Sequence, residues 1–161
     1  FENGSIYTHG EAFYLFALAY CRKADEFITE MYKTLPSNMI PDLVTGPPHQ
    51  QSNFFVGPEH EAYGTNLFSN FTGSVAWYRN AIEKIIGLLP DYDCLRIEPM
   101  VPGHWDTFEV TRIWRGVRLH FRFQRAKAFS IKFGGHETYT PSIPAADLNA
   151  GHEYDVEVSY T

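Results

Sequence analysis

The spacing of apolar residues changes along this chain, from a helical period in the first half to a period of two in the second. Residues 12–20 are apolar on nearly every side, and residues 24–35 repeat apolar side chains at helical spacing. After residue 117, apolar and polar side chains alternate strictly. A period near 3.6 predicts helices, whereas alternation predicts strands that bury one face. We therefore expect an α+β chain, with helices first and strands second.

Three helices are expected in the first half, over residues 10–21, 24–35 and 73–88. Pro36 and Pro90 follow the second and third segments, and proline ends helices because it has no N–H to donate. The first helix has no polar face, so we expect it to be buried all round. A chain of 161 residues offers few partners for such a helix. This predicts packing against protein outside the present sequence.

Residues 37–70 show no clear period and contain many prolines and glycines. A long loop of this kind is often functional. After the third helix, strands are expected over 117–124, 129–133 and 154–160. Short strands separated by glycine and proline turns predict an antiparallel β-sandwich. The expected domains are therefore 1–90, containing the helices and the long loop, and 91–161, containing the sandwich.

Composition and charge argue against several classes of protein. The net charge is -6 and there is no basic cluster, which disfavours a nucleic-acid partner. The apolar run at 12–20 is too short to span a bilayer, and no secretion signal is visible, so no membrane partner is expected. Cys21 and Cys94 lack metal-ligand or redox spacing, and two thiols fit a reducing cytoplasm. The scattered histidines give no reason to expect a metal site.

An anion site is expected where the third helix begins. Thr72 and Ser74 supply hydroxyl donors there, and Gly73 lets an oxyanion approach the free N–H groups of the helix. A plain N-cap by Thr72 is the structural alternative. His9 lies near the start of the first helix and is placed to donate to the same kind of anion. The alternative for His9 is a purely structural histidine.

No pair of carboxylates in this chain is convincing for glycoside chemistry. The candidates are Glu2, Glu11, Asp91, Asp93 and Glu98. Asp91 and Asp93 follow Pro90 and are interpreted as turn-forming residues. Residues 59–61 (EHE) lack the helical spacing of a zinc site, and we expect them to form hydrogen bonds within their loop. The sequence therefore assigns no general acid.

Four segments match, in order, the motifs of one known family. They are 2–9 (ENGSIYTH), 55–60 (FVGPEH), 70–77 (NFTGSVAW) and 87–99 (GLLPDYDCLRIEP). Together they resemble the cellobiose and chitobiose phosphorylases of glycoside hydrolase family ninety-four, from Phe1 to about Phe123. The resemblance implies the C-terminal helices of an (α/α)6 barrel followed by a β-sandwich, and a homodimer. It also implies inverting phosphorolysis of a β-linked glucoside to a sugar 1-phosphate.

In enzymes of this family, phosphate attacks the anomeric carbon directly, so one protein carboxylate is enough. Inorganic phosphate is then a co-substrate, and no cofactor is expected. The resemblance places that general acid, an aspartate, upstream of Glu2 and outside this chain, in the remaining N-terminal part of the enzyme. It implies that phosphate is held by His9, Thr72, Gly73 and Ser74. It also implies that the sugar lies near Glu2, Asn53 and Asn70.

The chain departs from the family pattern at several positions around the expected site. Asn70 replaces a tryptophan, Ser74 a threonine, Asn53 a glutamine, and Cys94 a glycine. These changes leave the acceptor sugar and the linkage open. Two other classes of function stay open as well. One is a non-catalytic module that binds glycans or has a structural role, and the other is an inverting β-glycoside hydrolase on the same barrel.

Overall fold

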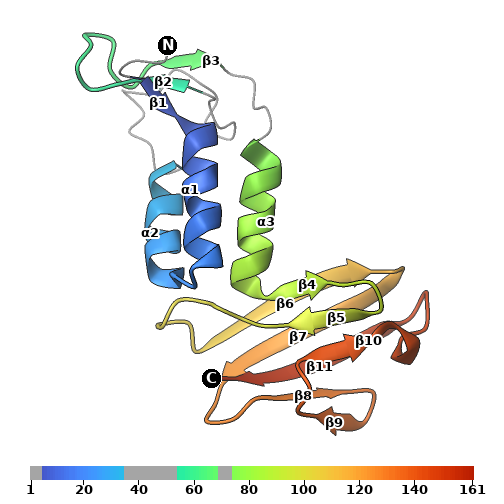
Figure 1. The fold of residues 1–161 in the computed structure, drawn as a ribbon. Coiled ribbons are helices and arrows are strands. Elements are labelled where there is room, and N and C mark those ends of the chain that lie inside the picture. The colour runs from blue at the N-terminus through green and yellow to red at the C-terminus, as the bar shows by residue number, and fades with distance from the viewer. Residues whose placement is uncertain (1–4, 35–53, 69–73) are drawn as a thin grey trace. The chain divides into compact units, whose positions relative to one another are not determined.

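The structure, a computed structural model, describes residues 5–34, 54–68 and 74–161. The chain forms two compact units, Phe1–Ile82 and Glu83–Thr161, and the boundary between them falls within α3 (Ser74–Ile86) (Figure 1). Three helices and three sheets confirm the α+β class. Whether the helices belong to an (α/α)6 barrel, and whether 1–90 and 91–161 are separate domains, stay predictions. No helix in the described segments has the length and apolar character needed to cross a membrane.

The first unit contains helices and a small sheet. Its helices are α1 (Thr8–Tyr20), α2 (Ala24–Thr34) and the first turns of α3 (Ser74–Ile86). Its strands are β1 (Ser5–Tyr7), β2 (Phe54–Val56) and β3 (Asn66–Phe68), in the order β1-β2-β3 with both pairs antiparallel. The three helices expected from the sequence are confirmed to within two residues at each described end.

Helix α1 packs against α2. The residues that it buries recur every three or four positions and are Ala12, Leu15 and Ala19; Phe27 of α2 is buried as well. Other sides of α1 are exposed, including Phe13 and Tyr14. The expected burial of the other sides of α1, against protein outside the present sequence, therefore stays a prediction.

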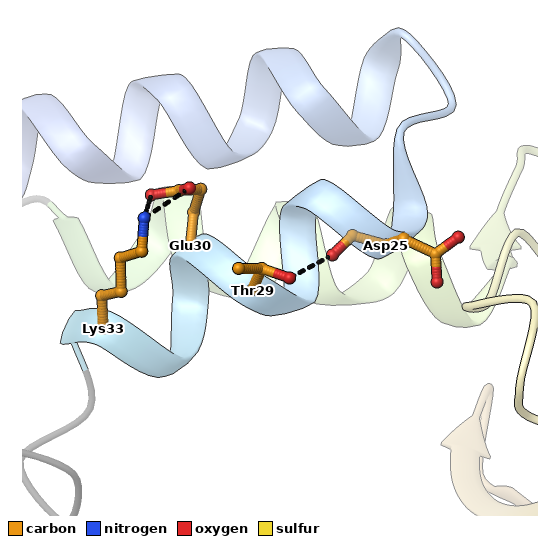
Figure 2. A network of polar contacts seen from close by, with 4 residues as sticks. All are labelled: Asp25, Thr29, Glu30 and Lys33. Atoms are coloured by element: carbon orange, nitrogen blue, oxygen red, sulfur yellow. Dashed lines mark hydrogen bonds and ion pairs between the residues drawn. The ribbon is translucent and has the colours of Figure 1, made fainter.

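Helix α2 carries polar contacts between successive turns (Figure 2). Lys33 Nζ donates to both carboxylate oxygens of Glu30, at 2.7 and 2.8 Å. Thr29 Oγ1 donates to the backbone carbonyl of Asp25 at 2.8 Å. Side chains three or four residues apart lie one turn apart on a helix, and such pairs contribute only a few tenths of a kcal/mol, roughly 0.3–0.5 when exposed.

The second unit contains two sheets. The smaller consists of β4 (Leu88–Pro90), β5 (Cys94–Ile97) and β10 (Ser142–Pro144), in the order β10-β5-β4. The larger has the order β6-β7-β11-β8-β9. Its strands are β6 (Thr107–Trp114), β7 (Val117–Arg125), β8 (Ser130–Phe133), β9 (His136–Thr138) and β11 (Glu153–Tyr160). A short 3-10 helix, η3 (Ala145–Asp147), follows β10.

The core of the second unit comes from the buried faces of both sheets. The larger sheet buries alternate residues of β7 and β11, namely Val117, Leu119, Phe121, Phe123, Val156, Val158 and Tyr160. The smaller sheet buries Leu95, Ile97 and Ile143. Phe108 stacks on Phe123 with ring centroids 4.3 Å apart. The alternation in the sequence thus corresponds to one buried and one solvent-exposed face of the sheet, in accord with a β-sandwich.

The expectation of an entirely antiparallel sandwich is wrong at its central pair. Strands β7 and β11 run parallel, in register from Arg118↔Glu153 to Arg125↔Tyr160. Alternation of side chains is the same in parallel and antiparallel strands, so the sequence pattern does not reveal strand direction. Residues 126–152 connect the two strands and contain β8, β9 and β10, which is long enough to return the chain to the same end of the sheet.

Candidate functional site

Strand pairing in the first unit brings together two of the sequence motifs. Strand β1 lies within the motif 2–9. Strand β2 begins one residue before the motif 55–60 and continues into it, and the two strands pair antiparallel. Tyr7 lies opposite Phe54 in this register, and their rings stack with centroids 4.5 Å apart and planes 11° apart. Segments nearly fifty residues apart in sequence are therefore adjacent where α1 begins (Figure 1).

His9 lies in the first turn of α1 and is held on two sides. Its Nδ1 is 2.9 Å from the hydroxyl oxygen of Tyr7. Its ring stacks on Phe13, one turn later, with centroids 4.8 Å apart and planes 16° apart. The ring is half-buried rather than enclosed. A histidine restrained in this way presents its other nitrogen, Nε2, in a defined direction.

The bond to Tyr7 determines what Nε2 can do. When the Tyr7 hydroxyl donates to Nδ1, the neutral imidazole carries its proton on Nε2. In the other neutral tautomer, Nδ1–H donates to the Tyr7 hydroxyl and Nε2 is an acceptor. The first tautomer, in which Nε2 is a hydrogen-bond donor, suits an anionic oxygen, as predicted for His9.

The end of α1 at which His9 lies is also favourable to an anion. Tyr7 occupies the N-cap position and makes no side-chain hydrogen bond to the first turn. Helix N-termini carry a partial positive charge, because their first N–H groups have no partner within the helix. His9 and the helix end thus act in the same direction electrostatically.

Glu11, one of the candidate carboxylates, lies in the same first turn of α1. Its Oε1 is buried and has no hydrogen-bond partner among the described residues. Burial raises the pKa of Glu11, the negative charge of Glu30 raises it further, and Lys33 lowers it. A carboxyl group in these surroundings is destabilised when ionised.

We expect Glu11→Gln to raise the melting temperature of the intact protein at about pH 8 and to have little effect at about pH 4. The pKa of Glu11 is higher in the folded than in the unfolded state, so its contribution is favourable at low pH and is lost as the pH rises through the folded-state value. Glutamine carries no charge at any of these pH values, so it removes this loss of stability at high pH. Differential scanning calorimetry across this pH range measures the effect, and Glu61→Gln in an exposed turn is the control. A pH-independent change would contradict the assignment.

Most of the other predicted site residues lie outside the described residues. This applies to the phosphate-binding candidates Thr72 and Gly73 and to the sugar-binding candidates Glu2, Asn53 and Asn70. Ser74 is the first residue of α3, which confirms a helix start at this motif. Helices α1 and α3 begin at their ends nearest the sheet β1-β2-β3 (Figure 1). That His9 and residues 72–74 bind one phosphate stays a prediction.

Two other candidates from the sequence, the segment 59–61 and Asp91, take part in local structure. His60 Nδ1 accepts a hydrogen bond from the N–H of Ala62 at 3.0 Å, within the β2–β3 connection, as expected for residues 59–61. Asp91 Oδ1 accepts from the N–H of Tyr92, and its other oxygen lies 3.4 Å from Arg96 Nε. Asp91 is thus a turn residue, as predicted. Within the described segments, no cluster of ligands suited to a metal ion occurs.

Comparison with known proteins identifies the family. Solabiose phosphorylase of Paenibacillus borealis is 30% identical over 118 residues, which cover 71% of this chain and 15% of that protein. N,N'-diacetylchitobiose phosphorylase of Vibrio furnissii is 30% identical over 80% of this chain and 16% of its own length. Cellobionic acid phosphorylase of Neurospora crassa is 26% identical over 98% of this chain and 21% of its length.

These matches show that the chain is related to the disaccharide phosphorylases, which are of the type of glycoside hydrolase family ninety-four. It spans about a fifth or less of the length of these relatives. No family model matches the chain. This relationship accords with the ordered motifs and with the helix start at Ser74.

Two residues that position His9 were not predicted from the sequence. Tyr7 bonds to the imidazole, and Phe54 stacks on Tyr7. The spacing of an aromatic residue two positions before a histidine was available as a signal for Tyr7. No signal in the sequence pointed to Phe54, because its proximity depends on the pairing of β1 with β2.

Proposed function

We propose that this chain is part of an inverting glycoside phosphorylase that cleaves a β-linked glucoside with inorganic phosphate and releases a sugar 1-phosphate. The observation that carries the proposal is the imidazole of His9, oriented by Tyr7 at the start of α1 within a motif of the family. The names of the relatives, which are phosphorylases of different disaccharides, support the same class of reaction. A cytoplasmic homodimer is proposed on the family resemblance.

The proposed reaction needs little covalent chemistry from this chain. Phosphate attacks the anomeric carbon from one face, and an aspartate in the remaining part of the enzyme protonates the leaving oxygen from the other. His9 Nε2 donates to a phosphate oxygen, together with the Thr72 and Ser74 hydroxyls and the N–H of Gly73. These donors neutralise charge on the attacking phosphate and fix its direction, which is how positioning lowers the barrier. No cofactor takes part.

The acceptor sugar is proposed to depend on Glu2, Asn53 and Asn70. The relatives act on solabiose, N,N'-diacetylchitobiose and cellobionic acid, so acceptors vary within the family. Asn53 and Asn70 carry short amides where the family pattern has a longer amide and an indole. Replacing an indole removes a stacking surface for a sugar ring and adds a donor and an acceptor. A more polar acceptor subsite is the proposed result.

The reaction class is tested with the intact protein and a panel of β-linked disaccharides, with and without inorganic phosphate. We expect cleavage only with phosphate, and proton NMR of the first product should show an α-linked sugar 1-phosphate. Free sugar at the same rate without phosphate would instead support an inverting hydrolase. Binding of glycans without any cleavage across the panel would support a non-catalytic module.

A further inference from the structure

A hollow in the second unit is lined by residues that the proposed reaction does not use. It has a volume of about 530 Å³ and lies among the β8–β9 hairpin, β10, η3 and β11 (Figure 1). Its lining residues are Phe133, Gly134, His136, Thr138, Thr140, Ser142, Pro144, Asp147 and Tyr154. Pockets for small ligands measure roughly 300–1,000 Å³, so this one has room for a sugar unit.

Two aromatic side chains form the wall of the hollow. Phe133 at the end of β8 and Tyr154 on β11 contact each other edge to face, with ring centroids 6.5 Å apart and planes 71° apart. Both are half-buried, so each keeps part of its ring surface open. Aromatic faces bind the C–H faces of pyranose rings well, because burying that surface removes apolar area from water at little entropic cost.

The hydroxyl of Tyr154 is oriented by its neighbour. Its oxygen lies 3.2 Å from both the backbone N and the Nδ2 of Asn149, two groups that donate to it. An oxygen that accepts both bonds keeps its own proton for a further acceptor. The Tyr154 side chain therefore combines a stacking surface with a donor whose direction is restricted, as recognition of a hydroxyl-bearing ring requires.

The rim of the hollow is polar, and no lysine or arginine lines it. Hydroxyls line it at Thr138, Thr140 and Ser142, and His136 adds an imidazole. Asp147 at the end of η3 has no ion-pair partner in the part of the chain that the structure describes. A carboxylate without a neighbouring cation repels anionic ligands and accepts hydrogen bonds from neutral hydroxyls. A single carboxylate is also too few ligands for a divalent ion.

We propose that this hollow binds one sugar unit of a neutral glycan. Phe133 and Tyr154 stack on the ring, while Asp147 and the neighbouring hydroxyls bond its hydroxyl groups. A phosphate or an acidic sugar is disfavoured by the carboxylate and by the lack of lysine and arginine, with His136 as the one basic side chain in the lining. A lipid or other purely apolar ligand would leave the rim hydroxyls unpaired, which costs free energy. The inference does not depend on the reaction proposed above.

Affinity electrophoresis of the intact protein, in gels with and without a soluble neutral β-glucan and without phosphate, tests the proposal. We expect the glucan to retard the wild-type protein. Tyr154→Phe and Asp147→Asn should each raise the dissociation constant at least about fivefold, the effect of losing one hydrogen bond. Tyr139→Phe is the matched control: it also removes one phenol hydroxyl, but from an exposed side chain outside the lining. Thermal melting of each variant verifies its fold.

Three outcomes would overturn the proposal: no retardation of the wild-type protein, equal retardation of all variants, or equally strong binding of an acidic polysaccharide that the same substitutions weaken. Disaccharide phosphorolysis is measured in parallel on each variant. We expect Tyr154→Phe and Asp147→Asn to leave its rate unchanged. Failure of the glycan site therefore appears in the gels alone, whereas failure of the proposed reaction appears in the phosphorolysis assay of the wild-type protein.

Discussion

Replacing His9 by alanine in the intact protein is expected to lower phosphorolysis by about 100-fold or more, because donors aimed at developing charge stabilise the transition state most. The loss should appear in kcat/KM for phosphate, measured with saturating disaccharide. The orientation of His9 is defined by two contacts: Tyr7 bonds Nδ1 at 2.9 Å, and Phe13 stacks on the ring. An unchanged rate would remove His9 from the phosphate site.

Tyr7→Phe separates positioning from binding in the same experiment. Phenylalanine keeps the stack on Phe54 and removes only the hydroxyl that bonds the imidazole. We expect a smaller loss than for His9→Ala, because the imidazole stays while its Nδ1 loses the bond that orients it. His60→Ala is the matched control, since among the described residues the His60 side chain bonds within the β2–β3 connection. It should leave the rate unchanged.

Gly87→Ala is expected to destabilise the second unit by about 4 kcal/mol. Gly87 follows α3 with φ +77, and a Cβ there would lie 2.2 Å from the backbone carbonyl carbon and oxygen of Glu98. That carbonyl cannot move freely, because Glu98 N–H donates to the Gly87 carbonyl and so holds the two backbones together. Hydrogen exchange of the β4 and β5 amides in the intact protein should show the loss of stability locally.

Gly151→Ala is the control for this substitution. Gly151 has φ +80, close to that of Gly87, but a Cβ at Gly151 would meet nothing within 4 Å. The control therefore reports the cost of a left-handed alanine alone, roughly 1–2 kcal/mol. The difference between the two variants isolates the steric clash. Equal losses at both positions would mean that the backbone at Glu98 yields, and would contradict the expected clash.

Local patterns determined the elements of this protein. The apolar positions of 24–35 recur at helical spacing, and the chain forms α2 there. The alternation after residue 117 became β7 and β11, with Phe121 and Val156 on the buried face. Period alone suffices for such assignments, because a helix or strand must turn its apolar side away from water wherever it packs. The order of the motifs likewise indicated the resemblance to the phosphorylase family.

Contacts between distant segments were decided by the tertiary structure alone. The parallel direction of β11 beside β7 leaves no trace in the alternation of either strand. The support of His9 by Phe54, through Tyr7, requires β1 to pair with β2 in one register. The hollow near Tyr154 is lined by residues of β8, β9, β10, η3, β11 and the connections between them, and these residues form no sequence motif. The sequence by itself specifies which face of each segment avoids water, but which segments then meet depends on the packing of all of them at once.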